Sequence, residues 1–144
     1  MNSDSKPGLP ASKTRILVVD DITRNLQVVG TMLRNAGYEI MPTTSGAQAL
    51  ERVRAQLPDL ILLDLMMPEM DGFELIHTLR KNPETREIPV VVLTAMDLSN
   101  ADHMMLASNV TEVLKKGASS RDEVLKIVKD LVESAMHRDS KKTH

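Results

Sequence analysis

The chain has 144 residues, the size of one ordinary domain, and a formal net charge of -2. It carries no block of basic residues, so its charge does not favour nucleic-acid binding. There are no cysteines, which excludes disulfides and thiol chemistry, and no apolar stretch approaches the roughly 20 residues that span a bilayer. We therefore expect a cytoplasmic protein that binds neither nucleic acid nor a membrane.

Strand and helix patterns alternate along the chain. Residues 1–13 are rich in Ser, Pro, Gly and Lys, which is typical of a flexible leader. Stretches rich in apolar residues predict five strands, at 15–19, 38–42, 59–63, 90–93 and 110–114, and the first and third of them contain short, continuous apolar runs. Apolar residues at helical spacing predict five helices, at 24–35, 46–57, 73–81, 97–108 and 120–136. The polar residues 137–144 are expected to form a flexible tail.

Single residues mark where several of these elements begin and end. Gly37 is placed to end the first helix, Ser45 to cap the second and Pro58 to close it. Pro42 indicates that the second strand lies at an edge, because proline cannot donate to the ladder. Strands that alternate with helices predict right-handed crossovers and a parallel sheet covered on both faces. The sequence thus predicts one α/β domain over residues 14–136.

Polar residues follow the ends of four predicted strands. Asp20 and Asp21 follow the first strand, Asp64 the third, Thr94 the fourth and Lys116 the fifth. Function gathers at the carboxyl ends of the strands in open parallel sheets, and three carboxylates there repel each other unless a cation neutralises them. Taken singly, each acid is more often a helix cap and the lysine a surface charge. Their combination predicts a site for a divalent metal beside a reactive aspartate.

Longer motifs around these residues resemble the receiver domain of the two-component response regulators, over about residues 14–135. They are Leu17-Val18-Val19-Asp20-Asp21, Leu63-Asp64-Leu65-Met66-Met67-Pro68-Glu69-Met70-Asp71-Gly72, Leu93-Thr94-Ala95 and Lys115-Lys116-Gly117. The resemblance implies a flavodoxin-like fold, in which a five-stranded parallel sheet of order 2-1-3-4-5 carries helices on both faces.

The resemblance also implies a role for each site residue. Asp64 would accept a phosphoryl group as a carboxylate nucleophile. The Mg²⁺ ligands would be Asp21, which binds directly, Asp64 and the backbone carbonyl of Met66. Asp20 would act mainly through a bound water molecule. Thr94 would hydrogen-bond to the phosphoryl oxygens and Lys116 would pair with them. Of the two adjacent lysines, Lys116 has the family spacing, and residue alternation points Lys115 the other way.

Three positions depart from the usual family pattern. Gly117 follows the lysine where most receivers have a cis-proline, so we expect a more mobile loop. Val113 stands where an aromatic switch residue is usual, so we hypothesise that phosphorylation reshapes the surface around the last helices by a different or weaker coupling. Met66 cannot orient an attacking water as an acid or amide does, so we expect a long-lived acyl phosphate.

The function implied by the resemblance is that of a single-domain response regulator. Its phosphoryl donor would be a histidine kinase or histidine phosphotransfer protein, and its output either a downstream protein partner or a further relay step, as in receivers of hybrid histidine kinases. We expect self-phosphorylation and slow autodephosphorylation rather than enzyme turnover. Two alternatives remain. One is a degenerate receiver that acts as a phosphorylation-independent scaffold, and the other is a phosphohydrolase, which would need a second acid where Met66 stands.

Overall fold

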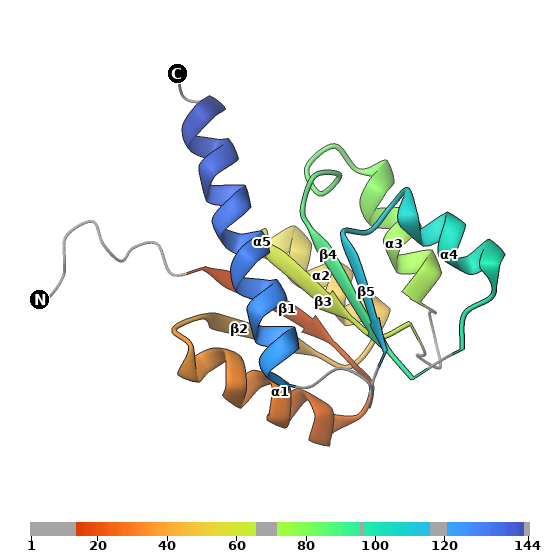
Figure 1. The fold of residues 1–144 in the computed structure, drawn as a ribbon, viewed down its shortest axis with the longest axis horizontal. Helices are drawn as coiled ribbons and strands as arrows, with labels where there is room; N and C mark the ends of the chain where they lie inside the picture. The colour runs from red at the N-terminus through yellow and green to blue at the C-terminus, as the bar shows by residue number, and fades with distance from the viewer. Residues whose placement is uncertain (1–13, 66–71, 96, 116–120, 143–144) are drawn as a thin grey trace, which may run out of the picture.

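Five parallel strands form one sheet in the order β2-β1-β3-β4-β5, which confirms the predicted fold (Figure 1). The computed structural model describes residues 14–65, 72–95, 97–115 and 121–142. The strands are β1 (Arg15–Val19), β2 (Glu39–Thr43), β3 (Leu60–Leu63), β4 (Val90–Thr94) and β5 (Glu112–Lys115). All four residues of β3 are buried, as expected for a strand at the centre of a covered parallel sheet.

Helices cover both faces of the sheet, and each layer has its own apolar core (Figure 1). The helices are α1 (Thr23–Asn35), α2 (Gly46–Ala55), α3 (Gly72–Lys81), α4 (Asn100–Ala107) and α5 (Arg121–Lys142). On one face α1 and α5 pack through residues such as Leu33 and Val128. On the other face α2, α3 and α4 pack through residues such as Val53, Leu75 and Leu106.

The register of the central strands brings their carboxyl ends to one edge of the sheet. Val19 at the end of β1 pairs with Leu63 at the end of β3. The next residues continue these ladders, since the Asp64 N–H donates to the Val19 carbonyl at 2.9 Å and the Asp20 N–H donates to the Thr43 carbonyl at 3.1 Å. Residues that directly follow β1 and β3 are therefore held side by side by backbone hydrogen bonds.

Three of the local signals work as the sequence predicts. Gly37 follows the α1 C-cap with a φ of 100°, and the N–H groups of Gly37 and Tyr38 donate to the last turn of α1. The Ser45 hydroxyl accepts a hydrogen bond from the Gln48 N–H at 3.1 Å at the start of α2. Pro42 lies in β2, which is an edge strand.

The predicted end of α2 is wrong. The helix ends at Ala55, and Gln56 is extended rather than helical. Leu57, which was expected on the apolar helix face, follows the helix and is 45% exposed. Pro58 explains the difference, because a proline disfavours the helical conformation of the residue before it.

The predicted limits of α4 and β5 are also displaced. A capping box between Ser99 and Asp102 begins α4 at Asn100, not at residue 97. The Val110 N–H donates to the Leu106 carbonyl at 2.8 Å, so Val110 closes the end of α4 instead of opening the strand. Sheet pairing begins with the Thr111 N–H, which donates to the Val90 carbonyl.

The last helix is longer than expected. It continues to Lys142, whereas the sequence analysis ended it at Met136 and assigned residues 137–144 to a flexible tail. No glycine or proline interrupts residues 137–142, so the sequence contains no signal that ends the helix before them. The proposed leader, residues 1–13, lies outside the described residues. Among the helices of the described chain, none has the length and apolar character that crossing a membrane requires.

Candidate metal and phosphorylation site

Asp20 is held at the turn from β1 into α1. Its side chain is only 7% exposed. One carboxylate oxygen accepts a hydrogen bond from the Ile22 N–H at 3.0 Å, and the other accepts one from the Asn25 side-chain amide at 3.2 Å. Ile22 is the N-cap of α1 and makes no side-chain cap hydrogen bond. The Asp20 carboxylate therefore helps to form the turn that starts α1.

Asp64 follows the buried strand β3 and is 6% exposed. The chain returns to it at Gly72, whose N–H donates to the Leu65 carbonyl at 2.8 Å. A Cβ atom on Gly72 would lie 2.5 Å from the Leu65 Cα and 3.1 Å from the Asp64 carbonyl oxygen. Only glycine allows this close approach of two backbone segments, so Gly72 fixes the base of the loop that follows Asp64.

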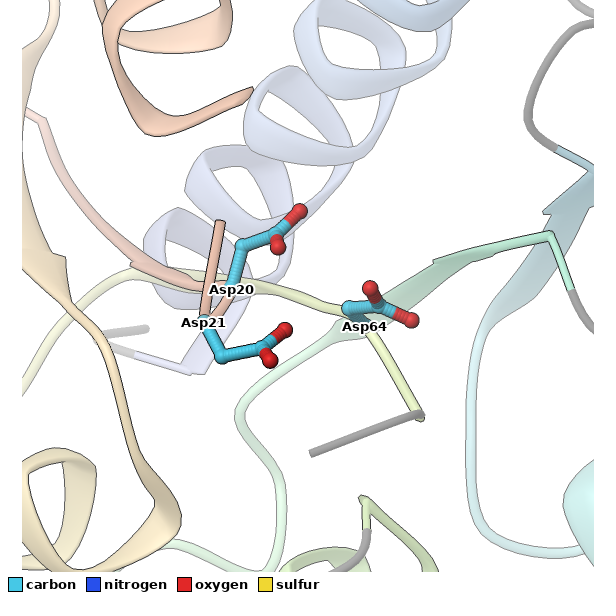
Figure 2. Close-up of side chains that lie close together, drawn as sticks. All are labelled: Asp20, Asp21 and Asp64. Atoms are coloured by element: carbon cyan, nitrogen blue, oxygen red, sulfur yellow. The ribbon is translucent and has the colours of Figure 1, made fainter. Parts of the chain in front are cut away.

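The three acidic residues predicted from the sequence come together. One ligand atom from each of Asp20, Asp21 and Asp64 lies within 4.8 Å of the other two, and Figure 2 shows their carboxyl groups gathered at the ends of β1 and β3. Asp21 is exposed, whereas Asp20 and Asp64 are buried, so the cluster opens to solvent on the side of Asp21. Carboxylates this close repel one another, and a divalent cation relieves that repulsion.

The donor set of this cluster fits magnesium. All three side chains offer carboxylate oxygens, which are the hard ligands that Mg²⁺ prefers, and Mg²⁺ commonly binds through one or two carboxylates together with phosphate oxygens. None of these three side chains is a soft sulfur ligand that would select another metal. The acidic pocket is thus compatible with both Mg²⁺ and phosphorylation.

Thr94 lies at the same edge of the sheet, as predicted. It is the last residue of β4 and is 1% exposed. Alternation along β4 places it on the same face as Val92, the residue that pairs with Leu63 of β3. The other two predicted site residues, Met66 and Lys116, lie outside the described residues, so their roles stay predictions.

Lys115, the lysine that the sequence analysis set aside, makes an ion pair with Asp97. It pairs with Thr94 in the register of β4 and β5, and its ammonium group contacts a carboxylate oxygen of Asp97 in the loop before α4. The hydrogen bond and the charge of Lys115 lower the pKa of the Asp97 carboxyl. Val113, on the same strand, is half-buried against the core beneath α2, α3 and α4.

Two contacts near the site were not predicted from the sequence. One is the hydrogen bond from the Asn25 amide to Asp20, and the other is the pairing of Asp97 with Lys115. The only signal for Asn25 is its place, in the first turn of the helix that follows the two aspartates. No local pattern connects Asp97 with Lys115, because they are far apart in the sequence and meet only through the pairing of β4 with β5.

Comparisons with known proteins agree with this geometry. The model of the response regulator receiver domain matches residues 16–129. The response regulator PleD of Caulobacter vibrioides is 43% identical over 102 residues, which cover 71% of this chain and 22% of PleD. The polar-differentiation response regulator DivK of Brucella ovis is 31% identical over 104 residues, which cover 72% of this chain and 85% of DivK. The chain thus spans about a fifth of the length of PleD but most of DivK.

Solved structures of receivers have the same fold. A putative response regulator from Chloroflexus aurantiacus is 29% identical, with a TM-score of 0.77, and the match covers 85% of this chain and 99% of that one. The receiver domain of the sensor histidine kinase PA1611 from Pseudomonas aeruginosa is also 29% identical, with a TM-score of 0.75 and the same coverage. That structure has a magnesium ion coordinated in its active-site cleft.

Proposed function

The chain belongs to the response regulator receiver domain family, and from that premise we propose that Asp64 is its phosphoacceptor. The observation that supports this most directly is the acidic cluster, in which the Asp64 carboxylate lies within 4.8 Å of the ligand atoms of Asp20 and Asp21. Carboxylates act as nucleophiles in phosphoryl transfer. A carboxylate oxygen of Asp64 would form the new P–O bond while the P–N bond of a donor phosphohistidine breaks and the imidazole leaves.

Magnesium would be held at this cluster by carboxylate oxygens and one backbone carbonyl, from Asp20, Asp21, Asp64 and Met66. When bound, Mg²⁺ supplies positive charge that offsets the carboxylates and the incoming phosphoryl oxygens. The donor set supports this assignment, and so does the magnesium ion in the related receiver of PA1611. Asp20 is already oriented by two hydrogen bonds, so it needs little rearrangement to take part.

The remaining two site residues would stabilise the transferred group. The Thr94 hydroxyl lies at the end of β4 and would donate a hydrogen bond to a phosphoryl oxygen. The Lys116 ammonium would pair with another phosphoryl oxygen, since Lys116 directly follows β5 in the sequence. Both groups act on charge that exists only after the phosphoryl group has arrived.

The output would be a change in protein binding rather than turnover of a separate substrate. Phosphorylation adds about two negative charges at the Asp64 pocket and biases the chain between two conformations. A downstream protein that prefers one conformation would read this change, or a histidine phosphotransfer protein would receive the group in a relay. The only chemistry of the chain itself would be self-phosphorylation and slow autodephosphorylation.

One observation favours a second candidate, a receiver that acts as a phosphorylation-independent scaffold. Val113 packs against the core where family members usually carry an aromatic switch residue, and an aliphatic side chain has no ring to reorient. A chain that binds its partner constitutively would not need that movement. The intact acidic cluster is what weighs against this candidate, because a scaffold does not require three clustered carboxylates.

Intact mass after incubation with acetyl phosphate and Mg²⁺ tests both candidates. The wild type should gain about 80 Da, the mass of one phosphoryl group, and Asp64→Ala should gain nothing. Asp130→Ala is the matched control, because it removes an exposed carboxylate on α5 and should be phosphorylated like the wild type. No gain in the wild type, under conditions that phosphorylate a known receiver, would contradict the proposal and favour the scaffold.

A further inference from the structure

The side chain of Asn25, on α1, contacts the carboxylate of Asp20. The Asn25 side chain is half-buried in the first turn of the helix, and its Nδ2 donates to Asp20 Oδ2 at 3.2 Å. The other oxygen of Asp20 accepts the Ile22 N–H at 3.0 Å. One acidic residue of the cluster therefore has each of its oxygens hydrogen-bonded within the turn that follows β1.

Two donors on opposite oxygens fix the plane of a carboxylate. The final torsion of an aspartate is broad, so a carboxyl group without such donors samples many orientations. Each carboxylate oxygen has two lone pairs, and a hydrogen bond to one of them leaves the other available to a cation or to a water molecule bound to it. The Asn25 amide thus limits the orientation in which Asp20 presents its carboxylate oxygens to the cluster.

We propose that Asn25 is a positioning residue that orients Asp20 for magnesium binding. The proposal rests on the proposed function, since it assigns the acidic cluster to Mg²⁺. Carboxylates that ligate metals are themselves hydrogen-bonded, and loss of such an outer partner typically weakens metal affinity 10- to 100-fold. Asn25 makes no direct contribution of charge, so its effect acts through the geometry of Asp20 alone.

A purely structural role for this amide is the competing explanation. Asn25 lies where side chains often cap a helix, but its backbone N–H already donates to the Ile22 carbonyl at 3.0 Å. Its side chain donates to a carboxylate of the cluster rather than accepting from the helix backbone. The start of the helix therefore keeps its backbone hydrogen bond without the Asn25 amide, and truncating the side chain should change metal binding more than folding.

The experiment measures Mg²⁺ affinity by isothermal titration calorimetry for the wild type, Asn25→Ala and Gln27→Ala. Alanine favours helix at both positions, and Gln27 is an exposed amide on the same helix, two residues along. We expect the Mg²⁺ dissociation constant to rise about 10-fold in Asn25→Ala and to stay at the wild-type value in Gln27→Ala. The melting temperature without Mg²⁺ should be similar in all three proteins.

Phosphorylation by acetyl phosphate at increasing Mg²⁺ gives a second readout. In Asn25→Ala the Mg²⁺ concentration for half-maximal rate should rise by the same factor, while the rate at saturating Mg²⁺ returns to the wild-type value. Asn25→Leu, which matches the shape of asparagine without a donor, should repeat this result and guards against a folding failure in the alanine variant.

The outcomes separate this proposal from the one on which it rests. If Asn25→Ala and Asn25→Leu both bind Mg²⁺ as tightly as the wild type, the positioning role is overturned. This holds even if either variant has a lower melting temperature. If the wild type itself neither binds Mg²⁺ nor gains a phosphoryl group, the assignment of the cluster fails, and the proposed function fails with it.

Discussion

Lys115 at the end of β5 pairs with Asp97 in the loop that leads into α4. The pair lies on the surface and joins the last strand of the sheet to the helix with the fewest buried side chains, since α4 buries only Leu106. Lys115 also pairs with Thr94 in the β4–β5 register. This exposed ion pair thus tethers the loop between a proposed phosphoryl-binding residue and α4 to β5.

Lys115→Met should raise the pKa of Asp97 toward its ordinary value. Lys115 lowers that pKa first through its hydrogen bond and second through its charge, and the substitution removes both. A carboxyl with a depressed pKa contributes stability above its unfolded pKa and loses it as the pH falls through the folded pKa. Titration of the Asp97 carboxyl by carbon-13 NMR, with and without Lys115, measures the shift.

The matched control for that titration is Lys126→Met, which breaks the separate pair with Asp130 on α5 and should leave Asp97 unchanged. Salt provides a second check, because the Debye length falls to about 3 Å at 1 M and exposed charges are then screened. An Asp97 pKa that does not respond to loss of Lys115 contradicts the pairing. The melting temperature should scarcely change, since exposed pairs contribute little.

Gly72→Ala should destabilise the fold and slow phosphorylation of Asp64. The new Cβ would lie 2.5 Å from the Leu65 Cα, so the backbone on either side of the loop must move apart. Overpacking of this kind costs about 1–3 kcal/mol in the free energy of unfolding. Urea denaturation measures that loss, and the rate of acetyl phosphate incorporation reports the displacement of Asp64.

Gly30→Ala is the control for the glycine substitution. At Gly30, a buried position in α1, the nearest contact of an added Cβ is the Arg34 guanidinium at 3.5 Å, an ordinary van der Waals distance. Alanine in a helix interior is favoured over glycine by roughly 0.5–1 kcal/mol, so this variant should be as stable as the wild type or more stable. Equal losses in the two variants would contradict the close approach at Gly72.

Val113 predicts that the conformational change on phosphorylation is limited to residues near Asp64. Beryllofluoride mimics the phosphoryl group, and without an aromatic ring at Val113 its effect should stay near the Asp64 pocket. Backbone amide shifts with and without beryllofluoride and Mg²⁺ measure this. Large shifts limited to residues near Asp64 agree with the prediction, whereas shifts that extend through β5 to Val124 of α5 contradict it.

The fold was predictable because its buried strands are continuous apolar runs. Every residue of β3 is buried, and the runs that predict β1 and β4 also lie in the sheet centre. One of the errors falls where a weak local preference competes with a hydrogen bond. Val110 favours a strand by its branched side chain, yet its N–H completes the last turn of α4. The sequence alone does not show whether the Val110 N–H donates within the helix or to a neighbouring strand.

The candidate site was predictable in part, for a reason that follows from the sheet. Asp20, Asp21 and Asp64 directly follow two neighbouring strands, so the parallel register alone brings them together. Contacts that depend on turn geometry were not predictable. The amide of Asn25 reaches Asp20 through the turn between β1 and α1, and no residue spacing encodes the geometry of that turn.

The three clustered carboxylates should lower the melting temperature of the metal-free protein, although they are the groups proposed to bind Mg²⁺. Asp21→Asn removes one of three carboxylates whose ligand atoms lie within 4.8 Å of one another, and the repulsion between the remaining two is smaller. Without Mg²⁺ the variant should therefore melt at a higher temperature than the wild type. Asp21 suits this test because it is the exposed member of the cluster, so an asparagine there can be solvated.

With Mg²⁺ added, the wild type should have a higher melting temperature than Asp21→Asn. A ligand that binds only the folded state stabilises it by about 2.7 kcal/mol at 100 times its dissociation constant, so the wild type should gain several degrees in melting temperature. Asp21→Asn should gain much less, because it lacks one of the proposed carboxylate ligands. Thermal melts with EDTA and with increasing Mg²⁺ measure both effects, and Ca²⁺-free buffers keep the comparison to one cation. A wild-type melting temperature that is the same in EDTA and in saturating Mg²⁺ would contradict the assignment of this cluster to a metal.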